Sequence, residues 1–330
     1  MPASLETRRL GASDLHVTAI GLGCMSLSGV YGASSDDNGV AVVHAALDAG
    51  VNFLDSSDMY GWGQNETLLA RALRGRRSGV ILASKFGQVR LESGGNGVDG
   101  SPAYVRAACE ASLKRLETDV IDLYYIHRID PKVAIEETIG AMAGLVREGK
   151  VRHLALCEAN PATIRRAHAV HPLAAVQTEY SLLYRAEAEE TLATTRELGI
   201  SFVAYSPLGR SLLTGEIKDA ADVANDRRKD HPRFAAENLT RNRQLVAALE
   251  TLATAKGCTP GQAALAWVLA QGRDVVAIPG TKRVERVAEN IGALRVTLSA
   301  AEVATLNAAF PKGAAAGTRY PAGQMKGVFI

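Results

Sequence analysis

Cysteine, net charge and long apolar runs are all scarce in this chain of 330 residues. The four cysteines show neither CxxC spacing nor another metal-ligand pattern, which indicates free thiols in a reducing compartment and no disulfide framework. With 37 Lys+Arg against 35 Asp+Glu, the formal net charge of +2 provides no electrostatic basis for binding nucleic acid or an anionic membrane surface. No apolar run is long enough for a membrane-spanning helix. The start, Met1–Leu15, lacks the apolar core of a signal peptide, so we expect a cytoplasmic protein.

Linkers and low-complexity stretches are absent as well. Hydrophobic residues make up 47% and charged residues 22%, which is typical of a folded protein and excludes disorder as the dominant state. Length alone suggests about two domains, but a single α/β barrel of this size is equally possible. On the barrel interpretation, we predict one domain over residues 1–330, with a Gly- and Ala-rich C-terminal tail at about 311–330.

Short apolar segments predict eight strands, and amphipathic patterns predict helices between them. The strand segments are Thr18–Leu22, Asn52–Asp55, Val80–Ser84, Ile121–His127, Arg152–Leu156, Ala175–Gln177, Ser201–Tyr205 and Val275–Pro279. The helical segments are 102–116, 135–146, Ala186–Leu198, Arg243–Lys256 and Val284–Ala293. Such alternation predicts parallel strands joined by crossover helices.

Two architectures fit this alternation, an open doubly wound sheet and a closed eight-stranded α/β barrel. The strand count favours the barrel. Almost every predicted strand also ends in polar or reactive residues. In a barrel these ends converge on one face, whereas in an open sheet only the strands at the switch point would carry them. These residues are Asp55, Lys85, His127, Cys157, Glu158, Gln177 and Ser206.

Four side chains at these strand ends can form a proton-donating centre. Tyr60 follows Asp55 in the adjacent loop, and Lys85 and His127 end two later strands. A phenol with its ordinary pKa of about 10 is a poor acid at neutral pH, and a nearby ammonium lowers that pKa. Asp55 can balance a buried Lys85, and a histidine can orient a carbonyl oxygen that the tyrosine protonates. Each residue also has a structural interpretation, as a turn carboxylate, a packed ring, a solvated ammonium or a hydrogen-bonded core histidine.

An acid of this kind supplies a proton and no electrons, so a reductase also needs a hydride carrier. The segment Ala277–Arg283 leaves the last predicted strand with small residues before a helix, and its backbone N–H groups can bind phosphate. Lys282 and Arg286 add basic side chains. The alternative is a glycine turn followed by a solvated basic helix face.

Together these motifs resemble the aldo-keto reductase family over about Leu10 to Leu306, in particular its bacterial and plant branch with His-Arg-Ile/Val-Asp after the fourth strand. The matching segments are Gly21–Met25, Asp55–Gly61, Ser84–Phe86, Ile126–Arg128, Ala204–Gly209, Ile278–Arg283 and Glu289–Asn290. The resemblance implies a (β/α)8 TIM barrel with an N-terminal β-hairpin, here Thr7–Leu10 with Leu15–Val17.

The resemblance also implies an activity, NADPH-dependent reduction of aldehydes or ketones to alcohols. It makes Tyr60 the acid, Lys85 and Asp55 the residues that tune it, and His127 the residue that orients the carbonyl. It assigns Cys157, Gln177 and Tyr205 to the nicotinamide, and Ser206 and Leu208 to the pyrophosphate. It assigns Gly280, Thr281, Lys282 and Arg286 to the 2′-phosphate, and Glu289 and Asn290 to the adenine. Two cations favour NADP over NAD, because the extra phosphate needs positive partners.

Two residues and one segment depart from the family pattern or extend it. Cys157 stands where the family usually has serine, and a thiol is a weak hydrogen-bond partner for the carboxamide. Trp62 stands where a smaller residue is usual, and it either contacts substrate at the mouth or packs on the rim. The charged segment Gly215–Asn238 is either a lid or a surface loop.

Two other functions stay open at this level. The same fold serves as a cofactor-binding regulatory subunit of potassium channels, and the four candidate residues do not exclude that function. A barrel lyase or isomerase without nicotinamide is less consistent with the sequence, because no metal-ligand cluster is apparent among the 7 histidines.

Overall fold

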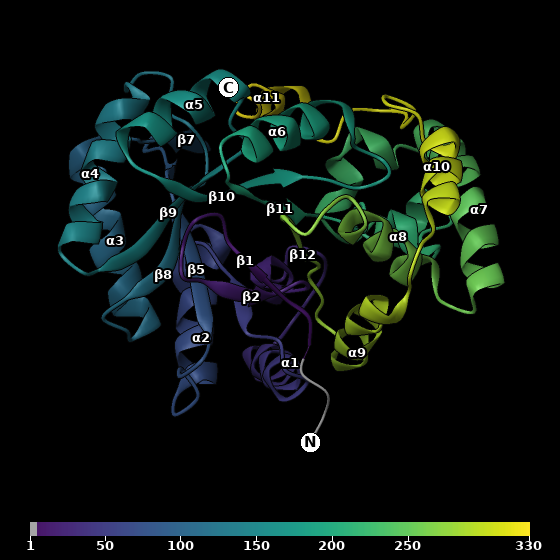
Figure 1. Ribbon diagram of the computed structural model, residues 1–330, viewed down its shortest axis with the longest axis horizontal. Coiled ribbons are helices and arrows are strands. Elements are labelled where there is room, and N and C mark those ends of the chain that lie inside the picture. Colours follow the sequence, from purple (N-terminus) through teal and green to yellow (C-terminus); the bar gives the residue numbers. More distant parts are fainter. Residues whose placement is uncertain (1–4) are drawn as a thin grey trace.

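A ring of eight parallel strands forms the centre of the computed structural model, which describes residues 5–330 (Figure 1). The strands follow one another around the sheet in chain order, and bridges from Ile20 to Ala277 and from Gly23 to Gly280 join the first to the last. The strands are β3 Leu22–Gly23, β4 Phe53–Asp55, β5 Ile81–Phe86, β8 Ile121–Ile126, β9 Val151–Cys157, β10 Leu173–Glu179, β11 Ser201–Tyr205 and β12 Val275–Ile278. The predicted (β/α)8 TIM barrel is therefore confirmed.

The helices surround this ring on the outside (Figure 1). They are α1 Asp36–Asp48, α2 Gln64–Leu73, α3 Pro102–Leu116, α4 Ile135–Arg147, α5 Pro161–Val170, α6 Ala186–Glu197, α7 Ala236–Lys256, α8 Pro260–Leu269, α9 Val284–Gly292, α10 Ala300–Ala309 and α11 Ala322–Met325. Local signals set many of the ends. The Ser101 side chain caps α3 by accepting from the Tyr104 N–H, and Gly149, with a φ of +75°, follows the last turn of α4.

Helix α7 begins at Ala236, before the predicted start at Arg243. Its first turns are polar, so their helical pattern is weak in the sequence. They are held instead by a distant partner, since the Asn242 amide donates to the Ala316 carbonyl over 3.0 Å and accepts from the Ala316 N–H over 2.8 Å. A contact with the C-terminal tail thus extends the helix.

The predicted N-terminal hairpin is present, as β1 Thr7–Arg9 paired with β2 His16–Thr18. Its Leu10, Leu15 and Val17 are fully buried and pack in one cluster with the side chains inside the ring, so the hairpin closes the amino-terminal end of the barrel. The prediction that the first barrel strand starts at Thr18 is wrong. Thr18 pairs with Thr7 in the hairpin, and the barrel strand β3 starts only at Leu22.

A second hairpin, β6 Gln88–Arg90 with β7 Asn96–Val98, and two long segments lie after the carboxyl ends of the strands. The segment 215–238 contains three short 3-10 turns and buries Arg233 and Phe234. In the tail, Arg319 is 1% exposed and the Phe329 N–H donates to the Glu158 carbonyl over 2.7 Å. Both segments are therefore packed against the face of the barrel that carries the polar strand ends.

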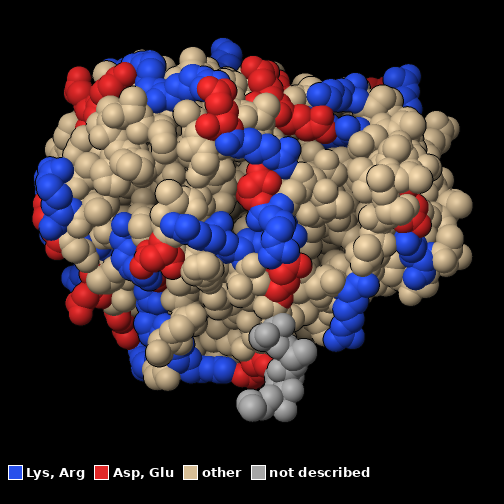
Figure 2. Space-filling view, viewed as in Figure 1, with Lys and Arg blue, Asp and Glu red and all other residues tan. Residues whose placement is uncertain are grey.

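Charged side chains of both signs alternate over the face shown in Figure 2, without a large area of one sign. Among the helices of residues 5–330, none combines the length and apolarity needed to cross a membrane. The same residues contain no group of three or more His, Cys, Asp or Glu side chains placed to hold a metal ion.

Candidate active site

The four predicted catalytic side chains come together at the carboxyl ends of β4, β5 and β8. Lys85 Nζ donates to Asp55 Oδ1 and to the Ser56 carbonyl at 2.7 Å, and it lies 3.5 Å from the Tyr60 hydroxyl oxygen. The Tyr60 and His127 rings meet edge to face, with centroids 5.8 Å apart. Their spatial arrangement is thus the one that the sequence predicts, and their chemical roles stay predictions.

The Lys85–Asp55 pair is almost completely removed from solvent, with side-chain exposures of 0% and 2%. Burial, the largest single effect, acts to lower the pKa of Lys85, but the charge of Asp55, helped by Tyr60, Cys157 and the hydrogen bond to Asp55, more than offsets it, and the pKa lies above its ordinary value. Lys85 therefore stays an ammonium at neutral pH. A buried cation of this kind is stable only beside its counter-ion.

The pKa of Tyr60 is raised, because burial disfavours the phenolate, while the nearby charge of Lys85 acts in the opposite direction. The sequence predicted the lowering effect of Lys85 but not the larger effect of burial, since burial depends on how the barrel closes. Tyr60 is consequently a protonated phenol at neutral pH, in contact with a fixed positive charge.

His127 is held as a neutral ring. Burial, followed by the charges of Arg128 and Lys85, places its pKa well below the ordinary value. Its Nδ1 lies 3.0 Å from the Ser57 hydroxyl oxygen. When Ser57 donates to Nδ1, the single ring proton is on Nε2, which can then donate to a ligand. The sequence analysis missed Ser57, although its position two residues after Asp55 was a usable signal.

A cavity opens beside Asp55 and Tyr60 and continues between the first and last strands of the barrel. Its wall includes five of the residues predicted to contact the cofactor, namely Gln177, Tyr205, Ser206, Leu208 and Gly280. It also includes residues that the sequence analysis did not assign, among them Ser26, Tyr31, Arg210 and Ser211. The predicted acid and much of the predicted cofactor site therefore share one cavity.

The cavity wall has features that suit a polar ligand. The Ser26 hydroxyl is buried without a hydrogen-bond partner among the described residues, and such a group ordinarily has one. A Cβ at Gly280 would lie only 2.9 Å from the Gly23 carbonyl oxygen, so only glycine allows the two backbones this close. Ser206 and Arg210 adopt left-handed backbone conformations, with φ of 47° and 56°, which are costly for non-glycine residues and concentrate at binding sites.

The two residues predicted to hold the nicotinamide carboxamide differ in position. Gln177 lines the cavity and donates from Nε2 to Asp55 Oδ2 over 2.8 Å, so it is also tied to the catalytic group. Cys157 is buried opposite Gln177 in the sheet register, is not part of the cavity wall, and has a pKa that burial raises. Its thiol is therefore protonated and unreactive at neutral pH.

The residues predicted to bind the 2′-phosphate and adenine, apart from Gly280, are outside the cavity wall. Lys282 Nζ donates to the Tyr31 carbonyl over 2.7 Å, and Arg286 forms ion pairs with Glu216 and Glu289. The remaining members of this group are Thr281, beside Lys282, and Asn290, which is buried in α9. The predicted phosphate-binding cations thus lie together at the start of α9, engaged by carbonyl and carboxylate oxygens.

Trp62 lies on the rim and not in the cavity wall. It is 37% exposed, has a φ of 53°, and stacks against Arg90 with 4.6 Å between the guanidinium carbon and the ring centroid. This arrangement agrees with the predicted rim position, and contact with substrate stays a prediction.

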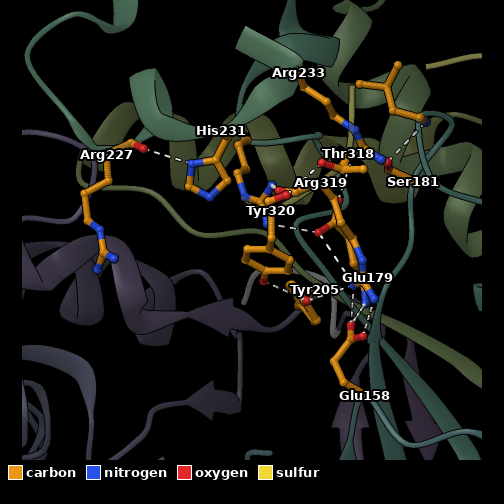
Figure 3. Close-up of polar contacts among 12 residues, drawn as sticks. Glu158, Glu179, Ser181, Tyr205, Arg227, His231, Arg233, Thr318, Arg319 and Tyr320 are labelled. Atoms are coloured by element: carbon orange, nitrogen blue, oxygen red, sulfur yellow. Dashed lines mark hydrogen bonds and ion pairs between the residues drawn. The ribbon is translucent and has the colours of Figure 1, made fainter. Parts of the chain in front are cut away.

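A buried ion network next to Tyr205 was not predicted (Figure 3). Arg319 pairs with both carboxylate oxygens of Glu158 and donates to the Tyr205 hydroxyl over 3.2 Å, while the Tyr205 and Tyr320 hydroxyls are 2.9 Å apart. Glu179 adds a second carboxylate, which pairs with further arginines described below. The tail therefore contacts a cavity-lining tyrosine directly.

Comparison with known proteins places these features in a family. A sequence profile described as "Aldo/keto reductase family" matches residues 19–310. Probable aldo-keto reductase 1 from Glycine max is 45% identical over 320 residues, which covers 96% of this chain and 92% of that protein. Among solved structures, glycerol dehydrogenase AKR11B4 from Gluconobacter oxydans superposes with a TM-score of 0.85 at 29% identity, covering 92% of this chain and 94% of that one. The holo form of aldo-keto reductase AKR11C1 from Bacillus halodurans superposes with a TM-score of 0.79 at 30% identity, covering 93% of this chain and 96% of that one.

The chain belongs to the aldo/keto reductase family. The family resemblance predicted from its motifs is thereby confirmed. It follows that the protein is an oxidoreductase of small-molecule carbonyl compounds, in a family whose members generally use nicotinamide cofactors.

Proposed function

We propose that the protein reduces aldehydes or ketones to alcohols with NADPH, and that Tyr60 is the general acid. The observation that carries this proposal is the 3.5 Å approach of the Lys85 ammonium to the Tyr60 oxygen, at the inner end of a cavity that Asp55 also lines. An acid beside a fixed cation suits a reaction in which negative charge develops on an oxygen.

The side chains have distinct tasks in this mechanism. Lys85 donates to the Tyr60 oxygen, which leaves the hydroxyl hydrogen free to point at the substrate oxygen. Neutral His127 donates from Nε2 to the substrate carbonyl oxygen and so orients the carbonyl group. Tyr60 gives up its proton as the oxygen becomes negative, and Lys85, held by Asp55, stabilises the phenolate that remains. The product alcohol thus receives its oxygen-bound proton from Tyr60.

The cavity wall fits a nicotinamide dinucleotide. When bound there, NADPH would supply the hydride for reduction of the carbonyl carbon. Tyr205 and Gln177 stand beside the catalytic residues for the nicotinamide end, and Ser26 with Ser206 offers hydroxyls along the cavity. The preference for NADPH rests on Lys282 and Arg286, which the 2′-phosphate would engage in place of their present oxygen partners. That Bacillus halodurans AKR11C1 has a structure named as a holo form is consistent with a cofactor in this fold.

The direct test is Tyr60→Phe, which removes one oxygen and keeps the ring. We expect NADPH oxidation with small aldehydes to fall by at least about 10²–10⁴-fold, because the proton donor is gone. NADPH binding, followed by the change in its fluorescence, should persist. Turnover at the wild-type rate by this variant would refute the assignment of Tyr60.

Three further predictions from the sequence remain part of the proposal. The relatives reported above are named as reductases and a dehydrogenase, so we retain the enzyme and not the channel-subunit hypothesis. We also keep the prediction of one domain over residues 1–330. A cytoplasmic location is supported by free thiols at all four cysteines, which are Cys24, Cys109, Cys157 and Cys258.

A further inference from the structure

Arg128, the residue after His127, differs from the buried arginines at the mouth of the barrel. Arg210 and Arg233 each lie 3.0 Å from a carboxylate oxygen of Glu179, and Arg319 pairs with Glu158. Within residues 5–330, no carboxylate oxygen lies within 4.0 Å of the Arg128 guanidinium. Its one hydrogen bond to protein runs to the adjacent His127 carbonyl over 2.8 Å.

Arg128 is also close to the reaction site. It is half-buried, and its charge is near enough to His127 to help lower the pKa of that ring. Its guanidinium carbon lies 6.0 Å from the ring centroid of Tyr320, whose hydroxyl is 2.9 Å from that of the cavity-lining Tyr205 (Figure 3). Arg128 thus stands between the proposed carbonyl-orienting histidine and the tail.

Arg128 has no carboxylate of its own. The charge of Glu158 acts on it from beyond ion-pair distance, but Glu158 is paired with Arg319, and Glu179 is paired with Arg210 and Arg233. A partly desolvated guanidinium without a counter-ion is costly and favours an anion as its partner. The planar donor fork of arginine fits carboxylate and phosphate oxygens in particular.

We propose that Arg128 binds an anionic group of the carbonyl substrate, a carboxylate or a phosphate separated by several bonds from the carbonyl. The inference rests on the proposed function and adds the substrate class: aldehydes or ketones that carry a negative charge at the end remote from the reacting carbon. His127 and Arg128 then hold the two ends of one substrate from adjacent positions of the chain.

Matched substrate pairs test the proposal on the wild-type enzyme with NADPH. The carboxylate pair is 4-carboxybenzaldehyde and methyl 4-formylbenzoate, and the phosphate pair is glyceraldehyde 3-phosphate and glyceraldehyde. We expect kcat/KM to be about ten- to a hundredfold higher for at least one charged member, mainly through a lower KM, since hydrogen bonds to charged groups are of this size. The two pairs distinguish carboxylate from phosphate as the preferred anion. Equal kcat/KM within both pairs would overturn the proposal.

Variants assign the preference to this side chain. Arg128→Met should reduce the charged-to-neutral ratio to near one, and Arg128→Lys should restore part of it, because an ammonium keeps the charge without the fork. Arg166→Met is the matched control, since Arg166 is an exposed arginine of α5 that pairs with Glu136. A ratio that survives in Arg128→Met would refute the proposal. NADPH affinity, measured by fluorescence, must stay within a few-fold of wild type; a large loss there would reassign Arg128 to the cofactor.

The two proposals fail in different ways. If the wild-type enzyme reduces none of the four test aldehydes, neutral or charged, the proposed carbonyl reduction is wrong. If it reduces neutral and charged members equally well, carbonyl reduction stands and only the anion site is wrong.

Discussion

The catalytic end and the predicted phosphate-binding end of the proposed active site are built on different physical principles. At the carbonyl end, Lys85 and Asp55 are sealed from solvent and their bonds are internal to the barrel. At the start of α9, by contrast, Arg286 is 26% exposed and Glu216, its partner from the segment 215–238, is 46% exposed. The Lys85–Asp55 pair must remain intact for chemistry, whereas the Arg286–Glu216 pair is accessible to a competing phosphate.

The difference is between a buried ion pair that stays fixed and an exposed ion pair whose partner a ligand can replace. A buried ion pair cannot lose one partner without leaving an uncompensated charge, so it holds its geometry throughout a reaction. Exposed pairs contribute at most about 1 kcal/mol, and a ligand anion can replace their carboxylate at little cost. The segment 215–238 supplies Glu216, and its Arg228 also stacks over the cavity-lining Tyr31 at 5.3 Å, so this segment is positioned to respond to cofactor binding.

The largest effect is expected where the buried end is broken. Lys85→Met should lower kcat by about 10²–10⁴-fold, because Tyr60 loses its cation and Asp55 its counter-ion. Steady-state kinetics on one aldehyde would measure it. The control is Lys150→Met, which removes a surface lysine that bridges Glu110 and Glu148 and should leave kcat within twofold. Near-normal turnover by Lys85→Met would show that the tyrosine needs no cation.

A second buried ion pair, Arg319–Glu158, allows buried and exposed pairs to be compared through stability and not through catalysis. Arg319→Met leaves Glu158 buried and unpaired, and we expect a loss of about 3–5 kcal/mol in the free energy of unfolding in urea. The double variant Arg319→Met/Glu158→Gln should recover part of this loss. Arg166→Met, at an exposed pair with Glu136, should cost at most about 1 kcal/mol. Equal losses for Arg319→Met and Arg166→Met would contradict the distinction.

The sequence allows the positions of the carbonyl-end residues to be predicted because their signals are local, whereas their chemical roles stay predictions. Most barrel strands are short apolar runs with a reactive residue at the end, as in Ile121–Ile126 followed by His127, and closure of the ring brings those ends together. The network of the tail has no such signal. Arg319 and Glu158 are 161 positions apart, and neither a buried arginine nor its partner can be recognised before the chain is folded. The same holds for the pKa of Tyr60, whose direction is set by burial.

A pH dependence should arise beside the buried end, at Asp58. Burial, reinforced by Glu66, raises the pKa of its carboxyl from 3.8 to about 7. The folded state then binds a proton that the unfolded state releases near pH 4, so this group makes stability fall as pH rises from about 4 to 7. Asp58→Asn should flatten that part of the urea-stability profile, and Asp119→Asn, at an exposed carboxylate, should not. An unchanged profile for Asp58→Asn would contradict the assignment.

The smallest effects are expected at the exposed end, where partners can be exchanged. Arg286→Met and Lys282→Met should each weaken NADPH binding about tenfold and NADH binding by much less, since a charge-assisted hydrogen bond to phosphate contributes roughly 1.5–3 kcal/mol before solvent screening. Glu216→Gln should tighten NADPH binding a few-fold, because it removes the carboxylate that competes for Arg286. Fluorescence titration at two salt concentrations measures all three, and the effects should shrink at the higher one. Weaker NADPH binding by Glu216→Gln would instead mean that this carboxylate holds Arg286 in its binding position, and the start of α9 would then be as fixed as the catalytic end.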